Sequence, residues 1–352
     1  FFHRKDGKVV GLWKRGFAAI SEDEGNSWST PVKIHTKPVG GAKEWAQRTT
    51  DGRYALVYNP MPGSYYRWPL GVITGDDGIT FDNLLAVQTE VPRARFTGQF
   101  KNPGSNYVRG ILEGNGTPPG ECFWVTFSMN KEDLWVSRIP VPIVGQVRAP
   151  VSDSFESPEA LQSWNVYSPQ WAPVSVAEFE GNGVLKLEDR DHSDYAKAVR
   201  VFPESERLTV GFKINLQSNR EGHFEIDVLD RFGTRALTIK FVSGRDVIWV
   251  TRGAAIAQVG GYEEGRWHEF EMALDARAQT YSLSLDGDQK LTDEPFFRDN
   301  VESLERIEFR TGFYRREDSI PYIHFVETEF AQPSADEAVR ASTILIDDLN
   351  IR

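Results

Sequence analysis

An eight-residue pattern recurs in the first 135 residues of the chain at an almost constant interval. Residues 21–28 read S-E-D-E-G-N-S-W, and residues 74–81 read T-G-D-D-G-I-T-F, 53 positions further on. A weaker copy at residues 128–135 begins 54 positions after the second. In every copy a hydroxyl-bearing residue precedes an aromatic residue by seven positions. Self-similarity of this kind indicates that one supersecondary unit is repeated along the chain.

The octamers have the chemistry of tight turns between strands. An aspartate carboxylate can accept backbone N–H bonds across such a turn, and glycine allows a positive φ. Alternating apolar runs flank each octamer, which makes it the turn between the third and fourth strands of a four-stranded unit. The expected strands are 1–4, 9–13, 17–21 and 28–35 in the first unit, 44–50, 53–58, 69–74 and 81–88 in the second, and 95–101, 107–112, 123–128 and 135–141 in the third.

Units of this kind are blades of a β-propeller, which closes a ring with about four to eight blades. Three blades are visible, so we expect others before Phe1, and residues 1–145 would then be the C-terminal part of a larger propeller. A linker is predicted at residues 146–152, which contain Pro150.

Residues 153–352 predict a separate β-sandwich, because short alternating runs recur there at sandwich spacing. The runs are 183–187, 208–214, 223–229, 236–241, 247–251, 267–273, 281–285, 306–313 and 342–351. The predicted fold class is therefore all-β: a partial propeller with three visible blades, followed by a sandwich of the jelly-roll type.

Charge and composition narrow the choice of partners. The chain carries 40 Lys and Arg against 51 Asp and Glu, which argues against nucleic acid because phosphate binding needs a basic face. Residues 1–150 differ, with 18 Lys and Arg against 14 Asp and Glu and six of the ten tryptophans. Cations beside aromatic rings suit acidic sugars, although ordinary core tryptophans and solvated arginines would give the same counts. No apolar stretch reaches the roughly 18 residues of a membrane span, and Cys122 alone allows no intrachain disulfide.

Three segments carry a resemblance to a known superfamily. Residues 51–60 (DGRYALVYNP), 107–111 (YVRGI) and 130–138 (NKEDLWVSR), together with the octamers, resemble the sialidase-like Asp-box (BNR repeat) propellers. The resemblance is nearest to secreted bacterial glycoside hydrolases and polysaccharide lyases that act on uronate- or rhamnose-capped glycans. It implies an extracellular or periplasmic location. It also implies a carboxylate-binding arginine triad, a Tyr/Glu nucleophile pair and an aspartic acid where the member is an exo-sialidase. The C-terminal half resembles laminin-G or concanavalin-like sandwiches.

Propeller topology predicts which loops would bind a ligand. The octamer turns share one face with the first-to-second strand turns, so the other loops form the ligand-facing side. The candidates for catalysis on that side are Arg67, Glu113, Tyr58 and Tyr107. The candidates for substrate binding are Arg15, Lys43, Tyr66, Arg93, Arg95 and His3. Lys131, Glu132 and Asp133, within the third octamer, are expected on the opposite face as structural residues.

Each catalytic candidate has a chemical reason and an ordinary alternative. A guanidinium such as that of Arg67 holds a carboxylate through two parallel bonds, but Arg67 could instead stack on Trp68 or Tyr66. Glu113 would act as an acid or base if it were buried, and otherwise it is a solvated loop carboxylate. Tyr58 and Tyr107 would act as nucleophile or base if arginines lowered their pKa. The alternative for both tyrosines is a place in the core.

No cofactor is required by these roles, although a structural calcium ion is conceivable in the sandwich. The first and last strands of such a sandwich would be neighbours, which would bring Glu156 close to Asp348. Carboxylate oxygens are the ligands that Ca²⁺ prefers. Two acids at strand ends without an ion are the alternative.

Together these features predict a carbohydrate-active enzyme, either a glycoside hydrolase or a polysaccharide lyase. Its substrate would be the end of an acidic glycan that contains uronate or sialate. A non-catalytic glycan-binding or adhesion protein is one alternative, because the same loops could bind without chemistry. An exo-sialidase is the other.

Overall fold

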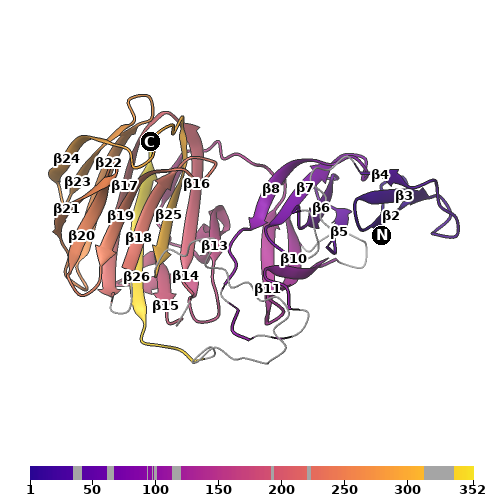
Figure 1. Cartoon of the computed structure of the whole chain (residues 1–352), viewed down its shortest axis with the longest axis horizontal. Helices are drawn as coiled ribbons and strands as arrows, with labels where there is room; N and C mark the ends of the chain where they lie inside the picture. The colour runs from indigo at the N-terminus through magenta and orange to yellow at the C-terminus, as the bar shows by residue number, and fades with distance from the viewer. Residues whose placement is uncertain are drawn as a thin grey trace. The chain divides into compact units, whose positions relative to one another are not determined.

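The computed structural model describes residues 1–34, 42–61, 67–92, 94–96, 98, 101–112, 120–191, 194–219, 223–312 and 337–352. Throughout these ranges the regular elements are β-strands, except for one 3₁₀ turn, η1 (Pro158–Ser163) (Figure 1). The described residues divide into two compact units, one within 1–145 and the other within 146–312 and 337–352. The predicted all-β fold class is therefore confirmed. None of the helical structure described is long and apolar enough to cross a membrane.

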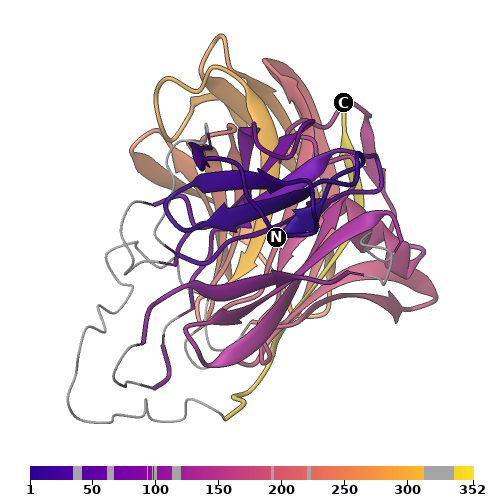
Figure 2. The same ribbon diagram turned by 90° about the vertical axis from the view of Figure 1, so that its right-hand side faces the viewer.

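Three small antiparallel sheets make up the first unit, and in each the strands pair in chain order (Figures 1 and 2). The strands of the first sheet are β1 (Phe2–His3), β2 (Val9–Trp13), β3 (Phe17–Ser21) and β4 (Val32–Lys33). Those of the second are β5 (Trp45–Arg48), β6 (Tyr54–Tyr58), β7 (Leu70–Gly75) and β8 (Asp82–Gln88). Those of the third are β9 (Ser105–Gly110), β10 (Cys122–Met129) and β11 (Asp133–Pro140). The inner strand expected at 95–101 falls partly outside the described residues, and the described part forms no named strand.

The first two octamers form the predicted turns. Asp23 accepts hydrogen bonds from the backbone N–H of Ser27 (2.8 Å) and from the hydroxyls of Ser27 (2.6 Å) and Ser21 (2.8 Å). These bonds hold the pKa of Asp23 at about 2. In the second turn the accepting carboxylate belongs to Asp77, which receives the Thr80 N–H at 2.6 Å. Asp76, the residue aligned with Asp23, pairs instead with Arg53 at 2.7 Å.

The third octamer forms a different turn, and its predicted position is wrong. Asn130 accepts a bond from the Gly104 N–H (2.8 Å) and donates to the Pro92 carbonyl (2.9 Å). Gly104 forms a parallel bridge with Arg67, which lies between β6 and β7. The β10–β11 turn is therefore at the end of the second sheet that carries the β6–β7 connection, away from the Asp23 and Asp77 turns.

Strand β6 is buried along its whole length because it packs on both faces. Its side chains alternate between the two faces, as in any strand. Tyr54, Leu56 and Tyr58 join the core shared with the first sheet, whereas Ala55 and Val57 join the core shared with the third. This explains why the sequence of β6 is uniformly apolar and aromatic rather than alternating.

The second unit is a sandwich of two antiparallel sheets around one large core. One sheet contains β14 (Val174–Phe179), β15 (Asn182–Asp189), β26 (Ser342–Ile351), β17 (Arg207–Ser218), β22 (Trp267–Asp275), β23 (Thr280–Leu285) and β24 (Asp288–Pro295), with β12 (Val151–Asp153) beside β26. The other contains β13 (Trp164–Tyr167), β16 (Lys197–Ser205), β25 (Leu304–Thr311), β18 (His223–Leu229), β19 (Arg235–Val242), β20 (Val247–Arg252) and β21 (Ala255–Gly261). The pairing of β12 with β26 confirms that the first and last strands are neighbours.

Period-two burial defines the sandwich core. In β22, His268, Phe270, Met272 and Leu274 are buried, and the residues between them are exposed or half-buried. Aromatic rings from both sheets meet inside, for example Phe212 with Phe309 at 5.3 Å between ring centres. Alternation of this kind is what one buried face and one solvated face require.

Candidate functional site

Glu44 and Tyr58 form an acid–phenol pair at one end of the second sheet. The β5–β6 register pairs Trp45 with Val57, so the residue before β5 lies beside the last residue of β6. Within the described structure, Oε1 of Glu44 and the hydroxyl of Tyr58 are both buried and lack a hydrogen-bond partner. Two neighbouring buried polar groups without partners are costly, and a bound ligand would relieve that cost.

Burial changes the proton chemistry of this pair. It raises the pKa of Glu44 to about 7, because the ionised carboxylate loses its hydration. Burial and the nearby carboxylate of Glu44 raise the pKa of Tyr58 as well. That direction is opposite to the lowering by arginines that an ionised tyrosine would need. Glu44 can therefore exchange a proton near neutral pH, and Tyr58 keeps its proton unless Glu44 removes it.

Arg67 is held by its backbone while its side chain keeps an unused donor. Its N–H donates to the Pro103 carbonyl (3.0 Å), and its carbonyl accepts the Ser105 N–H (2.7 Å). Gly104 has a φ of +93°, and a Cβ there would approach the Arg67 carbonyl oxygen to 2.5 Å. Nη1 of Arg67 is buried without a partner among the described residues. Such a fixed guanidinium with a free N–H is suited to a carboxylate.

Tyr107 stands beside Arg67 on a β-bulge. The β9–β10 register shifts between Thr126 and Ser128, and Tyr107 has a φ of +55°. A non-glycine residue in that region costs about 1–3 kcal/mol, which the surrounding structure must offset. The ring is 52% exposed, with the ammonium groups of Lys43 and Lys131 at 5.0 Å and 5.4 Å from its centre. Burial lowers the pKa of Arg67, and Tyr107 acts on it in the opposite direction, which shows that the two side chains are close.

We call the charged and tyrosine side chains at this end of the second sheet the β5 cluster. Its members are Lys43, Glu44, Tyr58, Arg67, Tyr107 and Lys131. Lys43 and Glu44 are consecutive residues immediately before β5 and face opposite sides of the sheet. One side carries the proton-exchanging pair, and the other carries the cations and the tyrosine ring.

The other predicted site residues lie elsewhere or cannot be placed. Arg95 is bound to Asp133 (2.6 Å) and lies 3.6 Å from Glu132, so its guanidinium serves the β10–β11 turn. His3 pairs with Glu24 of the first octamer turn at 2.9 Å, on the end away from the β5 cluster. Arg15 is exposed in the β2–β3 turn with a φ of +70°. Glu113, Tyr66 and Arg93 lie outside the described residues.

Sequence reasoning missed Glu44 and assigned Lys131 to the wrong face. Glu44 is the first residue of the predicted inner strand 44–50, and its place at the end next to the inter-blade segment was the available signal. Its burial against Tyr58 depends on the packing of two sheets, which no local pattern reveals. Lys131 was missed because the third octamer resembles the first two in sequence but not in position.

Asn59 is the residue that positions the Arg67 loop. It is buried, and its Nδ2 donates to the carbonyls of Arg67 (2.8 Å), Pro69 (3.2 Å) and Ser105 (3.4 Å). We expect Asn59→Ala to lower the free energy of unfolding by about 1–3 kcal/mol, because buried carbonyls would lose their donor. Urea unfolding of the wild type and the variant would measure it. An unchanged midpoint would show that these bonds contribute nothing.

The predicted calcium site remains a prediction. Asp348 pairs with Lys213 at 2.7 Å, so a cation already occupies one of the two proposed ligands. Burial, and the charges of Asp348 and Glu156, raise the pKa of Asp347. No group of three or more potential metal ligands occurs in the part of the chain that the structure describes.

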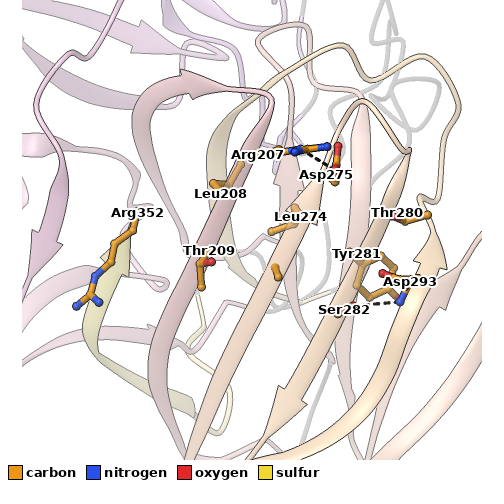
Figure 3. Close-up of a pocket in the computed structure, with 11 residues that line it drawn as sticks. Arg207, Leu208, Thr209, Leu274, Asp275, Thr280, Tyr281, Ser282, Asp293 and Arg352 are labelled. Atoms are coloured by element: carbon orange, nitrogen blue, oxygen red, sulfur yellow. Dashed lines mark hydrogen bonds and ion pairs between the residues drawn. The ribbon is translucent and has the colours of Figure 1, made fainter.

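A hollow of about 500 Å³ lies on the outer face of the sandwich sheet that contains β17, β22 and β23 (Figure 3). Its floor is formed by small side chains, Thr209, Ala273 and Ser282, that pair across these strands. The Arg207–Asp275 ion pair, at 2.7 Å, stands at one end of it. The hollow is lined by polar and apolar side chains, and its one aromatic residue, Tyr281, is buried, so it is less suited to a sugar ring than the β5 cluster.

The comparisons with known proteins concern both units of this all-β chain. Residues 164–321 match the family model described as "Sialidase-like, CBM domain". A solved structure named "Sialidase" is 34% identical to the chain with a TM-score of 0.89, and the match covers 100% of this chain and 32% of that protein. The chain thus spans about a third of the length of that sialidase.

Two further solved structures resemble the chain only weakly. The GH43 protein BlXynB from Bacillus licheniformis is 13% identical, with a TM-score of 0.39 over 99% of this chain and 73% of that one. The Trypanosoma rangeli sialidase in complex with sialic acid is 12% identical, with a TM-score of 0.35 over 98% and 59%. These two likenesses carry no functional weight. A search of curated proteins found no match.

Proposed function

We propose that this protein cleaves a glycosidic bond at the end of an acidic glycan, with Glu44 as the proton-transferring group and Arg67 as the carboxylate ligand. The observation that carries the proposal is the carboxyl group of Glu44, which has a pKa of about 7 and whose buried Oε1 lies beside the Tyr58 phenol. The 34% identity to a protein named "Sialidase" supports the same class of substrate. An extracellular or periplasmic location is part of this proposal.

In hydrolysis Glu44 and Tyr58 have the proton-transferring and nucleophilic roles. Protonated Glu44 can donate its proton to the departing glycosidic oxygen. Ionised Glu44 can instead accept the proton of Tyr58, which would free the phenol oxygen to attack the anomeric carbon. Hydrolysis requires a proton for the leaving group and a nucleophile. The Glu44–Tyr58 pair can supply one or the other, depending on whether Glu44 is protonated.

A lyase would use the same groups differently. Arg67 would neutralise the uronate carboxylate, which acidifies the C–H bond beside it. Ionised Glu44 would remove that proton, and the glycosidic oxygen would leave as the double bond forms. Both reactions therefore depend on one carboxylate ligand and one proton-exchanging group.

Glycan binding without cleavage is the second candidate function. The match of residues 164–321 to a carbohydrate-binding domain model favours it for the sandwich. It is compatible with catalysis in the first unit, so the two candidates are separated by turnover rather than by affinity.

The test is to incubate the protein with sialate-capped and uronate-capped oligosaccharides and analyse the products. We expect new reducing ends, and a gain of ultraviolet absorbance from an unsaturated uronate if the enzyme is a lyase. Retention on immobilised glycan without either product would replace the proposal by the binding function. Neither retention nor product would reject both.

A further inference from the structure

The start of β5 and the strand β9 each contribute one cation and one aromatic ring, in opposite order. Lys43, two residues before Trp45, has its ammonium group 5.0 Å from the centre of the Tyr107 ring. Arg109, two residues after Tyr107, has its Cζ 5.8 Å from the centre of the Trp45 ring. These two contacts show that the segments run next to each other in the same direction, so each ring meets the cation of the other segment.

The Trp45 ring is held in one position. Its Nε1–H donates to Oε1 of Gln47 at 2.8 Å. Gln47 is buried, and its Nε2 has no hydrogen-bond partner within the described structure. Gly110 leaves the space that the ring needs, because a Cβ there would approach Trp45 Nε1 to 2.1 Å and Gln47 Oε1 to 2.2 Å. The indole is therefore oriented by the fold before any ligand binds.

Arg109 keeps its hydrogen-bond donors available. Its side chain is exposed, and its guanidinium forms no hydrogen bond or ion pair with any residue that the structure describes. Other arginines of this unit differ, since Arg95 is bound to Asp133 and Arg53 to Asp76. A guanidinium stacked on an aromatic ring is held through its flat face, while the N–H groups in its plane can bind another group. Two parallel N–H donors of this kind match a carboxylate.

Tyr107 connects this stacked pair with the β5 cluster. Tyr107 interacts electrostatically with Arg67, and its ring is 52% exposed. Arg109 follows Tyr107 by two residues on β9, which corresponds to about 6–7 Å along an extended strand. A sugar chain whose terminal carboxylate is bound by Arg67 can therefore pass the Tyr107 ring and present its second residue to Arg109.

We propose that Arg109, stacked on Trp45, is a specificity-determining residue that binds the carboxylate of the second sugar residue of the glycan. The inference rests on the proposed function for the nature of the ligand, an acidic glycan whose end is bound at Arg67. Arg67 takes the carboxylate of the terminal residue, and Arg109 takes the next one. The protein thereby prefers two consecutive uronates to a single uronate attached to a neutral sugar.

Calorimetry on the Glu44→Gln variant measures this preference without turnover. The probes are methyl glucuronide, glucuronosyl-glucose and glucuronosyl-glucuronic acid, which differ in whether a second residue is present and whether it carries a carboxylate. We expect the probe with two uronates to bind about tenfold more tightly than glucuronosyl-glucose, a difference of about 1.4 kcal/mol. Added salt should reduce the preference, because Arg109 is exposed.

Variants identify the residues that produce the preference. Arg109→Gln should abolish it and leave the affinity for methyl glucuronide unchanged, because Arg109 contacts only the second sugar residue. Arg109→Lys keeps the charge but loses the planar donors, so it should retain only part of the preference. Trp45→Phe keeps a ring beneath Arg109 and should retain more of the preference than Trp45→Leu. Arg53→Gln makes the same charge change at the Asp76 pair and should leave the preference unaltered.

Equal affinity for the two disaccharides, binding of none of the three probes, or a preference that persists in Arg109→Gln would overturn the assignment of Arg109. The proposed function fails separately. If the preference depends on Arg109 but the wild type releases no product from any acidic oligosaccharide, the role of Arg109 in binding stands and the enzyme assignment does not.

Discussion

Glu44→Gln is expected to lower kcat/KM for acidic oligosaccharides by roughly 10²–10⁴-fold, the range that a general acid or base contributes. Glutamine has nearly the same shape as glutamate but exchanges no proton, so the loss reports the chemistry rather than the packing. Steady-state kinetics with a uronate- or sialate-capped oligosaccharide would measure it. A loss of less than about tenfold would remove Glu44 from the proton-transfer role.

The pH profile of the wild-type rate distinguishes whether Glu44 acts as an acid or as a base. Glu44 has a pKa of about 7 in the folded protein, so it is protonated below that pH and ionised above it. If it acts as the acid, the wild-type rate should fall as the pH rises through about 7; if it acts as the base, the rate should fall as the pH drops through the same value. This change of rate near pH 7 should be absent from the pH profile of Glu44→Gln.

The thermal stability of Glu44→Gln provides a control, because the variant is expected to lose activity but to gain stability at high pH. The carboxyl group has an ordinary pKa of 4.5 and a pKa of about 7 in the folded protein, so the folded state favours its protonated form. The wild type therefore loses stability as the pH rises from 4.5 to about 7, and the loss stays constant above that. Glu44→Gln should raise the melting temperature at pH 8 and not at pH 4 if the variant is correctly folded.

Arg67→Ala is expected to reduce kcat/KM for acidic substrates by about 100-fold or more, because charged hydrogen bonds contribute about 1.5–3 kcal/mol each and 1.4 kcal/mol is a factor of ten. The backbone bonds to Pro103, Ser105 and Asn59 do not involve the side chain, so the fold should persist. Circular dichroism and the unfolding midpoint would establish that the variant is folded.

Two further variants serve as controls for Arg67→Ala. Arg67→Lys keeps the charge but loses the two parallel N–H donors, and it should recover only part of the activity. Arg53→Gln removes a charge at the opposite end of the second sheet, where Arg53 pairs with Asp76, and should retain wild-type kinetics. Full activity in Arg67→Ala would exclude the carboxylate role.

Much of the architecture could be predicted because it depends on local chemistry. The octamers at 21–28 and 74–81 combine hydroxyl, carboxylate and glycine in a turn that closes on itself, and the strands β3 and β7 end where those turns begin. Alternation predicted strands such as β17 and β22 correctly. Period-two burial requires no knowledge of distant residues.

Features that depend on partners distant in sequence could not be predicted. The third octamer looks like the other two, but its Asn130 binds Gly104, which forms a bridge with the distant Arg67. Arg95 was expected to bind substrate, yet Glu132 and Asp133 hold it. A charged side chain has the same sequence signature whether it meets a ligand or a neighbouring acid.

By itself the sequence determined the turns, most of the strands and the all-β class, because these follow from φ preferences, turn hydrogen bonds and the alternation of side chains along a strand. Only the tertiary structure decided the site. Glu44 gains its raised pKa from burial between packed sheets, and Lys43 and Lys131 meet at Tyr107 although 88 residues separate them. Desolvation and the gathering of like charges arise only when distant segments come together.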